Sequence, residues 1–475
     1  MTKEIIKLLY KNRYKILITS QVIFLVIYIF VLQDYILKLA ENLNDEMDVY
    51  YYKSIFNYLP ASILISFAAL FVLISLRHKI LNLFQKLDER WLITCLMVFL
   101  FLVQVFILIF IKTQPYSDSK KYLELADRLF TTGSYINEYG NKTAFYPVGL
   151  PALLCFLKII FGDMLMAGRI FNIIFSLATM FFIYKVFRQF LKKNELYLFL
   201  TVFFLFPNNF FAVNPILTEQ VFSFLLWAFI YLFFRKEKFL PFVGGIILGL
   251  MLYFRSYSFL ILLVIFFYSF KMGLSKKYFR NILVMTVVMV MVAMPWFVRN
   301  YLTFNSIVPM TTNGGFNFLM GNHKASYGNI NFDFHYNIDN SNEAEESYRT
   351  YVAGLKEIFT NPIRLIYLLP LKLIHTYKRG DVYLTWSLKK TENSLNPLLI
   401  SFFFYLTNLT FYFVLFVGIL KLFLIKNFSM PQKFFLYLIM SFLIICLIYV
   451  GNERYILPVL SIHFYFFSLN VNENT

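Results

Sequence analysis

An aspartate and two lysines follow directly on a long apolar run. The run WLITCLMVFLFLVQVFILIFI, residues 91–111, is followed closely by QPYSDSKKYLELADRLF, which places Asp118, Lys120 and Lys121 just beyond it. A carboxylate can accept a proton, and ammonium groups can bind a phosphate. These residue types together predict a proton transfer beside a phosphorylated ligand.

Further ionisable residues lie at the ends of other apolar runs. They are a glutamate in NPILTEQ, arginines next to three runs, and a Glu-Arg pair in GNERYILP: Glu219, Arg169, Arg255, Arg299, Glu453 and Arg454. An ionisable side chain at membrane depth is costly, so it tends to face a cavity or a charged partner. We therefore expect Asp118 and Glu219 to be catalytic carboxylates of one cluster, in which the cations, including Lys120 and Lys121, bind the phosphate.

Each of these residues also has a purely structural interpretation. Asp118 suits the N-cap position of the helix that SDSKKY begins. Lysines at such a place are often interfacial anchors, Glu219 and Arg255 can form an ion pair, and Arg169 can extend to the lipid headgroups. The sequence by itself leaves these alternatives open.

The sequence indicates neither a metal site nor a soluble nucleotide. His323, Asp333 and His335 do not have the spacing of zinc or calcium ligands, and the three cysteines lie in apolar segments without a CxxC pair. P-loop, GxGxxG, HExxH and GxSxG motifs are absent. We expect no required cofactor, and whether a divalent metal takes part stays open.

The composition predicts that these residues are positioned by membrane-spanning helices. The 475 residues are 59% hydrophobic and 15% charged, whereas globular domains carry about a quarter charged residues. Several apolar runs reach the roughly 20 residues that a helix needs to cross a bilayer. The net charge of +18 lies mostly in short turns between these runs, so it indicates orientation in a membrane and no nucleic-acid partner.

Run length and turn charge predict an all-α polytopic membrane protein with twelve transmembrane helices. The predicted spans are 16–33, 59–76, 91–111, 164–184, 196–213, 219–234, 239–253, 257–270, 281–298, 397–423, 433–450 and 456–470. Lysine and arginine gather in the turns of one side, which predicts that both termini are cytoplasmic and that the charged cluster lies on the outer face. The apolar stretches 151–162 and 363–379 are too short or too interrupted by proline to be counted as spans, and juxtamembrane helices, one of them begun by SDSKKY, complete the pattern.

The spans divide the chain into four parts. Residues 1–90 form an N-terminal transmembrane hairpin, and 91–298 form a catalytic transmembrane core with a first outer loop at 112–163. Residues 299–396 form one large outer loop, and 397–475 hold the C-terminal transmembrane helices. A segment as long as 299–396 is expected to carry binding residues.

Several motifs in this order resemble those of the GT-C glycosyltransferases, above all family 39, which includes protein O-mannosyltransferases and a bacterial aminoarabinose transferase acting on lipid A. The motifs are D-x-x-K-Y-x-x-x-A from Asp118, FYPVGLPALL followed by FGD and Arg169, P-x-L-T-E-Q, YFRSYS, MPWFVRNYLTFNSIVPMTTNGGFNFLMGN and ERYILPVL, which together cover about residues 112–460. The resemblance departs at Ser119, where many relatives have a second carboxylate, and at Val148, where YPPG is common.

The resemblance implies a GT-C fold and transfer of a sugar from a polyprenyl phosphate, with inversion, to an acceptor at the outer face. It implies that Asp118 is the catalytic base and that Lys121 lies near the donor phosphate. Through the matching segments, the resemblance also assigns further residues to the site for the donor phosphate and sugar. They are Lys120, Tyr122, Tyr146, Arg169, Arg255, Arg299 and Arg454. The enzyme would be of the hexosyl or pentosyl type, in a bacterial plasma membrane, with a lipid, protein or polysaccharide as acceptor.

Elementary chemistry agrees with such a site. Inverting displacement at an anomeric carbon needs a carboxylate to take the acceptor's proton and cations where negative charge grows on the leaving phosphate. A flippase or exporter of lipid-linked sugars, a polysaccharide polymerase or ligase, and a non-enzymatic scaffold remain alternatives at this stage. A flippase predicts broken segments near mid-span in two related halves, which the sequence does not display.

Overall fold

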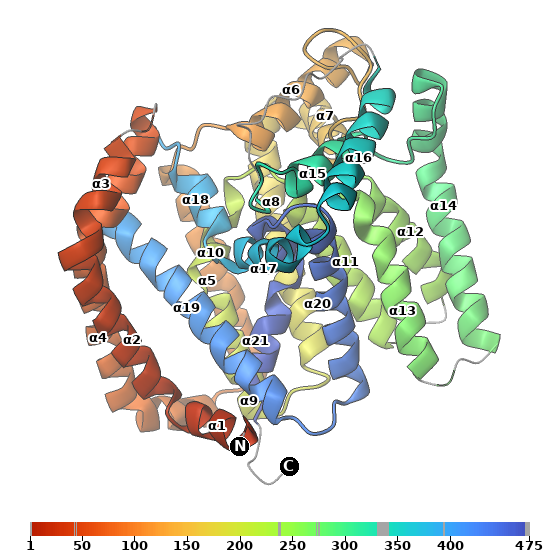
Figure 1. Ribbon diagram of the computed structural model, residues 1–475. Coiled ribbons are helices and arrows are strands. Elements are labelled where there is room, and N and C mark those ends of the chain that lie inside the picture. Colours follow the sequence, from red (N-terminus) through yellow and green to blue (C-terminus); the bar gives the residue numbers. More distant parts are fainter. Residues whose placement is uncertain are drawn as a thin grey trace.

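Nearly every described segment of the chain is helical (Figure 1). The computed structural model describes residues 2–470 except 42, 44, 236–238, 272, 274–275, 330–341 and 393–394. The described residues form no strand, and their β-pairing is limited to two isolated bridges. The predicted all-α class is confirmed. Asp333 and His335 lie outside the described residues.

The N-terminal part is a helical hairpin that packs on a C-terminal helix (Figure 1). Its elements are α1 (Thr2–Lys11), α2 (Arg13–Ile27), the π-helical η1 (Tyr28–Leu32), α3 (Gln33–Glu41) and α4 (Glu46–Lys86). Figure 1 shows α4 beside α19 (Pro397–Leu424), and Ser62 Oγ donates to Ser401 Oγ at 2.9 Å between them. The predicted hairpin is therefore attached along one side of the rest of the bundle.

The central part carries most of the buried core. Its elements are α5 (Glu89–Phe110), α6 (Ser117–Thr132), α7 (Gly149–Phe161), α8 (Met164–Phe187), α9 (Lys193–Phe204), α10 (Pro207–Phe210), η2 (Phe211–Val213), α11 (Thr218–Arg235), α12 (Leu240–Leu252), η3 (Ser256–Phe259), α13 (Leu260–Lys271) and α14 (Lys276–Phe304). Aromatic rings fill its centre, where Phe187 stacks on Tyr465 at 4.8 Å and contacts Trp227 at 5.3 Å between ring centroids. Lipid is as apolar as the protein core, so burial alone does not drive helices together in a membrane. Packing contacts between aromatic rings can hold them together instead.

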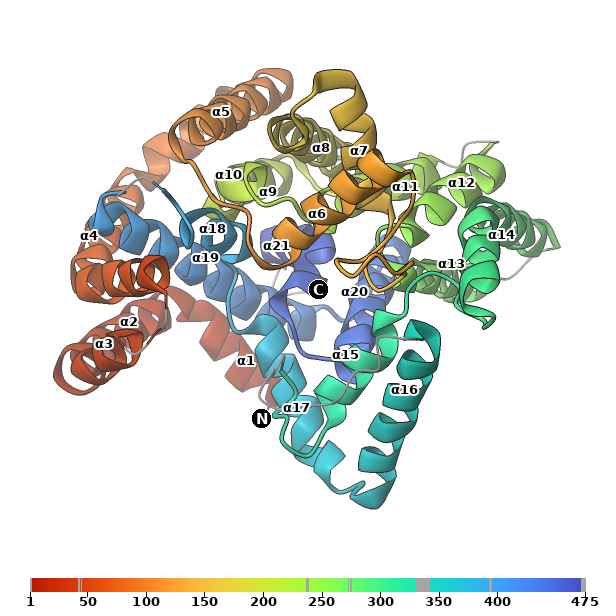
Figure 2. The same cartoon turned by 90° about the horizontal axis from the view of Figure 1, so that it is seen from above.

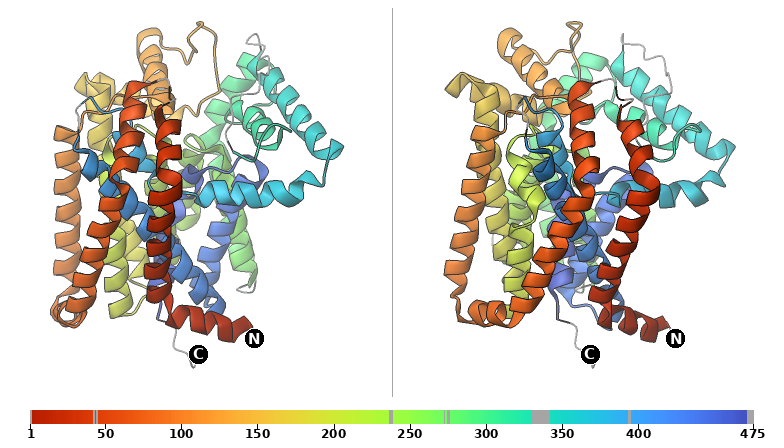
Figure 3. Two further views of the ribbon diagram at one scale, coloured as in Figure 1. Left: turned by 60° about the vertical axis from the view of Figure 1, so that its left-hand side comes forward. Right: turned by 90° about the vertical axis from the view of Figure 1, so that its left-hand side faces the viewer.

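The described residues of the predicted large outer loop form four helices of their own. They are α15 (Asn313–Asn322), α16 (Glu343–Thr360), α17 (Arg364–Tyr377) and α18 (Val382–Leu388). Figure 3 shows α17 lying across the bundle rather than along it, as expected for the proline-interrupted stretch 363–379. After α19 the chain continues through α20 (Met430–Ile448), η4 (Glu453–Val459) and α21 (Leu460–Ser468).

Among the described residues, six helices are long and apolar enough to cross a membrane. They are the segments Arg13–Glu41, Glu89–Phe110, Met164–Phe187, Lys276–Phe304, Pro397–Leu424 and Met430–Ile448. A seventh candidate is α9 with the short helices after it, which bend by 58° at the break where Pro207 begins α10. The chain is an integral membrane protein, but the predicted number of twelve spans is not confirmed, because α12 and α13 are shorter than a full crossing.

Two juxtamembrane helices lie where the sequence predicts them. Helix α6 buries Tyr122, Leu125 and Ala126 on one face, and ends at Gly133, whose φ of +67° needs a residue without Cβ. Helix α7 has 13 residues, too few to cross, and packs on α6 and α8.

The first and last described helices, α1 and α21, have their outer ends at the end of the bundle away from α6 (Figure 1). Lys421 Nζ lies 5.9 Å from the ring centroid of Tyr10 and donates to the carbonyl of Phe467, so the first and last helices meet there. The described ends of the chain therefore lie on one side of the bundle, and that this side is cytoplasmic stays a prediction.

Candidate active site

Four charged side chains from distant parts of the chain meet beside the first turn of α6. Arg454 donates from Nη1 to Asp118 Oδ2 at 2.5 Å, from Nε to Glu219 Oε1 at 2.5 Å and from Nη2 to Glu219 Oε2 at 3.2 Å. Arg255 Nη2 also donates to Glu219 Oε1. The structure thus brings together four of the residues that the sequence predicts, two carboxylates and two guanidinium groups.

Burial differs sharply within this cluster. The side chain of Glu219 is 1% exposed and both of its oxygens are held by guanidinium groups, whereas the side chain of Asp118 is 29% exposed. A carboxylate enclosed by two cations cannot easily reach a substrate proton. The catalytic role of both carboxylates stays a prediction. Asp118 is the more accessible of the two, whereas Glu219 holds the two arginines.

Both arginines stay charged in this environment. Burial lowers the pKa of Arg454, but the carboxylates of Glu219 and Asp118 raise it well above its ordinary value. Burial also lowers the pKa of Arg255, which Glu219 more than offsets. The cluster thus pairs two positive with two negative charges in a mostly buried place.

The backbone at the start of α6 fixes the direction of Asp118. Ser117 has a φ of +48°, a conformation that costs a residue with a side chain roughly 1–2 kcal/mol. Tyr116 occupies the N-cap position without a side-chain cap bond, and Asp118 lies in the first turn. The alternative that Asp118 caps the helix is therefore wrong, although its carboxylate is near the positive end of the helix dipole.

Arg454 is positioned by its own turn and by an aromatic stack. Asn452 Oδ1 accepts a hydrogen bond from the backbone N–H of Arg454 at 2.8 Å. The guanidinium carbon lies 5.2 Å from the ring centroid of Trp386, which stacks on Tyr116 at 4.8 Å. Trp386 therefore connects α18 to the segment that carries Asp118.

Asp118 and Arg454 line a small cavity, which we call the polar chamber, of about 180 Å³. Its wall includes two tyrosines in edge-to-face contact, Tyr122 and Tyr146, with ring centroids 5.6 Å apart. Burial raises the pKa of Tyr146 to about 12, so this residue stays a neutral hydroxyl donor. The predicted binding residues Tyr122 and Tyr146 thus belong to the site.

A glycine joins the two segments that carry Tyr146 and Arg255. The backbone N–H of Gly149 donates to the carbonyl oxygen of Tyr253 at 2.9 Å. A Cβ at position 149 would lie 2.7 Å from the same oxygen, so the backbones can approach this closely only at a glycine. The FYPVG and YFR motifs are brought together by this contact.

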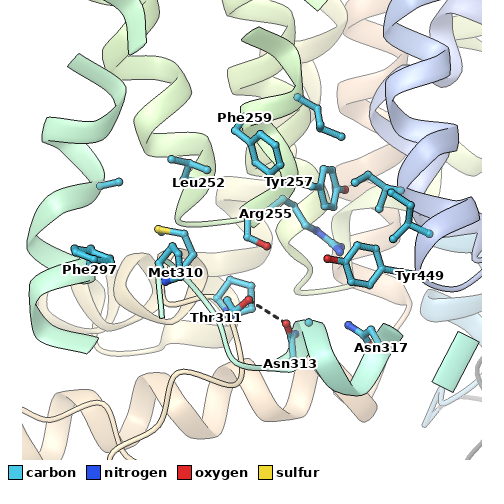
Figure 4. Close-up of a pocket in the computed structure, with 18 of the residues that line it drawn as sticks. Leu252, Arg255, Tyr257, Phe259, Phe297, Met310, Thr311, Asn313, Asn317 and Tyr449 are labelled. Carbon is cyan, nitrogen blue, oxygen red and sulfur yellow. Dashed lines mark hydrogen bonds between the residues drawn. The ribbon is translucent and has the colours of Figure 1, made fainter. Parts of the chain in front are cut away.

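The polar chamber adjoins a larger cavity, the apolar groove, of about 660 Å³ (Figure 4). Residues common to both linings are Pro147, Arg255, Asn313, Asn317 and Tyr455. The remainder of the groove is formed mainly by apolar side chains of α12, α14 and α20 and of the segments near them, including Leu252, Phe259, Val290, Met294, Phe297 and Ile444. A charged chamber therefore continues into an apolar groove at Arg255.

Two predicted arginines lie elsewhere. Arg169 Nη2 donates to the carbonyl of Thr113 at 2.5 Å, and Arg299 donates to the carbonyls of Tyr135 and Thr143 at 3.0 and 2.9 Å. Neither lines the polar chamber or the apolar groove. Both arginines bond backbone carbonyls of irregular segments, which need donors where water is scarce, and their role in donor binding stays a prediction.

The two predicted lysines face away from the polar chamber. Lys121 Nζ donates to Glu138 Oε2 at 2.7 Å, a bond that raises the pKa of Lys121. Lys120 is 65% exposed and lies 4.0 Å from Glu124. The structure therefore places both on the surface of α6, outside the residues that line the cavity.

Several lining residues were not among the predicted site residues. They include Asn313 and Asn317 of α15, Phe316 between them, and Asn452. Two features of the sequence could have indicated these residues. One is the polar, glycine-containing segment TTNGGFNFLMGN in the predicted outer loop, and the other is their place next to Arg454. No three His, Cys, Asp or Glu side chains in the described part of the chain are grouped so that they could hold a metal ion.

Comparison with known proteins finds similar solved structures at low identity. No family model matches, and no curated protein matches. The chain is similar to solved structures. Over 80% of its length it matches half of AglB, an archaeal oligosaccharyltransferase from Archaeoglobus fulgidus, in complex with an inhibitory peptide and a dolichol-phosphate, with a TM-score of 0.48 and 12% identity.

The second similarity covers more of the other protein. ArnT from Cupriavidus metallidurans in the apo state matches 79% of this chain over 77% of its own, with a TM-score of 0.38 and 11% identity. The chain spans about half the length of the archaeal enzyme. The function proposed below rests on the geometry of the polar chamber and the apolar groove.

Proposed function

We propose that this chain is a membrane glycosyltransferase that moves a sugar from a polyprenyl-phosphate donor to an acceptor at the outer face, with inversion. The observation that carries the proposal is the joining of the polar chamber to the apolar groove at Arg255. A donor of this class has an apolar chain, a phosphate and a sugar in the same order. Its three parts match the groove, the arginine and the chamber.

Arg255 has capacity for a phosphate. Its Nη2 is bound to Glu219, while its buried Nε has no hydrogen-bond partner among the described residues. A buried guanidinium N–H left unpaired is costly, so a ligand oxygen there would be stabilising. The donor phosphate would occupy this position, with its polyprenyl chain along Phe259 and Met294 in the apolar groove.

Asp118 would act as the base in a displacement at the anomeric carbon. The acceptor oxygen forms a bond to that carbon while the bond from carbon to phosphate oxygen breaks, and the electron pair leaves with the polyprenyl phosphate. The acceptor's proton passes to Asp118, whose Oδ2 is held by Arg454 and whose other oxygen is available. The cations Arg255 and Arg454 stabilise the charge that grows on the phosphate. No proton needs to be supplied to the leaving group, because phosphate is already a stable anion.

The location follows the charge pattern of the turns. Helix α6, whose first turn carries Asp118, lies at the end of the bundle opposite to α1 (Figure 1), and the lysine-rich turns predict that the α1 end is cytoplasmic. We place the chain in a bacterial plasma membrane with the chamber on the outer face. The sugar would be a hexose or pentose, and the acceptor a lipid, a protein or a polysaccharide.

The proposal is tested with the full-length protein in vesicles and a polyprenyl-phosphate hexose labelled in the sugar. Release of free polyprenyl phosphate, with the label appearing on an acceptor or in water, is expected only with the active protein. Mass spectrometry of envelope glycans from cells with and without the protein identifies the product. Translocation of intact donor without release of polyprenyl phosphate would instead support the flippase alternative, and an unchanged donor and glycan profile would overturn the proposal.

A further inference from the structure

A second apolar cavity lies on the opposite side of the bundle. This hairpin groove, of about 880 Å³, is formed by the N-terminal hairpin and α19. Its wall includes Leu17, Phe24, Phe56 and Phe404. Figure 2 shows the hairpin helices at the opposite edge of the molecule from α12, α13 and α14, which flank the apolar groove.

The hairpin groove has a cationic mouth. Lys378 and Arg379 line it, whereas their partner Glu453 does not. Arg379 donates to Glu453 Oε1 from Nε at 2.7 Å and from Nη2 at 2.6 Å, and Lys378 Nζ lies 3.7 Å from Oε2. The Glu453 side chain is 8% exposed, whereas those of Arg379 and Lys378 are 28% and 36% exposed. Burial lowers the pKa of Arg379, but the carboxylates of Asp381 and Glu453 raise it above its ordinary value, so Arg379 is a paired cation. Lys378 is the more exposed cation of the two.

The mouth adjoins the candidate active site through the chain itself. Glu453 precedes Arg454, which holds Asp118. Tyr52 lines the hairpin groove, and the phenol of Tyr116, two residues before Asp118, lies close enough to both Tyr52 and Arg379 for their charges to influence its pKa. A headgroup bound at Lys378 and Arg379 would thus be next to the residues that position the base.

We propose that the hairpin groove holds the acceptor, and that the acceptor is a lipid with an anionic, hydroxyl-bearing headgroup. This inference rests on the proposed function and deepens it by naming the class of acceptor. The acyl chains lie between α2, α4 and α19, the anionic group contacts Lys378 and Arg379, and a hydroxyl of the headgroup extends toward Asp118. Donor and acceptor then enter from opposite sides, so neither apolar chain has to pass the other.

Charge and shape favour a lipid over the other acceptors. A protein or polysaccharide acceptor would approach from water and would leave an apolar groove of this size without a purpose in the transfer. A zwitterionic or neutral lipid would fill the groove but would not use the two exposed cations. The hairpin that builds the groove also explains why residues 1–90 precede the predicted catalytic part.

The test introduces the same large side chain, tryptophan, at two positions, one inside the hairpin groove and one outside it. Ser20 lines the hairpin groove, so Ser20→Trp fills it, whereas Leu102→Trp adds a ring to the exposed outer side of α5. Phosphatidylcholine vesicles contain the labelled donor and rising fractions of phosphatidylglycerol, or of the anionic lipids extracted from the source membrane. Label in the organic phase as glycosylated lipid, and label released to water, are measured separately.

We expect Ser20→Trp to raise several-fold the anionic-lipid fraction that gives half-maximal transfer, while the half-saturating donor concentration and the release of label to water stay unchanged. Leu102→Trp should match the wild type. Lys378→Gln, which changes a partly exposed residue and leaves the groove open, should weaken the preference for anionic lipid over neutral glycolipid. If Ser20→Trp fails to fold, Lys378→Gln alone decides.

The outcomes separate the two proposals. Label transferred to protein or soluble glycan, with all three variants equal to the wild type, overturns the lipid acceptor and leaves the glycosyltransferase standing. Equal behaviour of Ser20→Trp and Leu102→Trp toward anionic lipid overturns it as well, and shows that the groove holds only ordinary bilayer lipid. Failure of the wild type to cleave the donor under any condition overturns the proposed function itself.

Discussion

Asp118 keeps one carboxylate oxygen on Arg454 while its side chain stays 29% exposed, so under the proposed function the other oxygen would face the substrate. This division matters because a base must be held still and must also remain accessible. Arg454 restrains Asp118 from one side, and Glu219 restrains Arg454 from the other. The proton transfer proposed for Asp118 therefore depends on three side chains in series, those of Asp118, Arg454 and Glu219.

Replacing Asp118 by Asn should abolish transfer while the protein stays folded. The amide keeps the size of the side chain but cannot take the acceptor's proton, and general-base catalysis contributes about 10²–10⁴-fold. Donor turnover in vesicles measures the loss, and a thermal unfolding curve in detergent checks folding. Asp127→Asn is the matched control, since Asp127 is on the same helix but is bound to Lys158, outside the residues that line the polar chamber. Activity of Asp118→Asn equal to that control would sink the assignment of the base.

Ser117 should tolerate glycine and reject a β-branched residue. Its φ of +48° suits glycine, whereas valine adds a side-chain clash of at least about 1–2 kcal/mol that would shift the first turn of α6. We expect Ser117→Gly to keep near-normal donor turnover and Ser117→Val to lose most of it. Equal turnover of the two variants would show that the backbone at Ser117 does not position Asp118.

The helices of the outer segment form a brace for the turn that carries Arg454. Lys372 on α17 is buried, and its Nζ donates to Asn322 Oδ1 at 2.9 Å and to the carbonyls of Leu447 and Ile448 at 2.9 and 3.4 Å. It thus caps the carboxyl end of α20 and connects it to α15. A Cβ at Gly451 would lie 2.2 Å from the carbonyl of Lys372, so the turn after α20 lies directly against α17.

Lys372 should give the protein a distinct dependence of stability on pH. Burial, with a further contribution from Arg364, lowers the pKa of Lys372 to about 7, against about 10.4 in an unfolded chain. Between these values the unfolded chain binds more protons, so this residue's contribution to the free energy of unfolding rises with pH. Below about pH 7 both states are protonated and the contribution is constant.

Thermal unfolding at pH 7 and at pH 9.5 measures this effect. The unfolding temperature of Lys372→Met should gain less, or lose more, on going to pH 9.5 than that of the wild type. Lys276→Met removes an exposed lysine and should behave as the wild type does. Parallel pH profiles of Lys372→Met and the wild type would contradict the argument.

At the scale of the whole molecule, two apolar cavities lie on opposite sides of one charged cluster. The apolar groove reaches it through Arg255. Arg379, which lines the hairpin groove, bonds Glu453, the residue before Arg454. The aromatic core between them holds α11 against η4, since Trp227 Nε1 donates to the carbonyl of Pro458 at 2.8 Å. The bundle therefore separates the two apolar cavities.

The orientation of this arrangement in the membrane can be measured. In a protein whose three native cysteines are replaced by alanine, Lys120→Cys should react with a membrane-impermeant maleimide on intact cells. Lys276→Cys, at the start of α14, should react only after the cells are opened. The reverse pattern would invert the topology and move the polar chamber to the cytoplasmic side.

Much of the site could be predicted from charges at the ends of apolar runs. Asp118, Glu219, Arg255 and Arg454 meet because each ends or begins a run at the same depth. The same rule fails for Arg299, since a guanidinium that bonds backbone carbonyls has the same position in the sequence as one that binds a ligand. The two cases differ only in which distant loop lies beside them.

The fold was predictable where local patterns suffice. The amphipathic α6 and the short α7 follow from periodicity and length, whereas the four helices between Arg299 and Asn396 do not, because their apolar pattern is weak and they are held by contacts such as Lys372 to Asn322. The bend after α9 is a further case, since Pro207 marks a possible break but not its angle of 58°.

The equal numbers of carboxylates and guanidinium groups around Asp118 have an electrical consequence. With a polyprenyl-phosphate sugar, the donor phosphate goes from one negative charge to two as the bond breaks, while Asp118 loses its charge by taking the proton. The total charge at that depth does not change, so an electric field across the membrane does almost no work on the reaction. Turnover in vesicles should be the same with no potential and with a potassium diffusion potential of about −100 mV; a clear change would mean that the proton leaves the site during transfer.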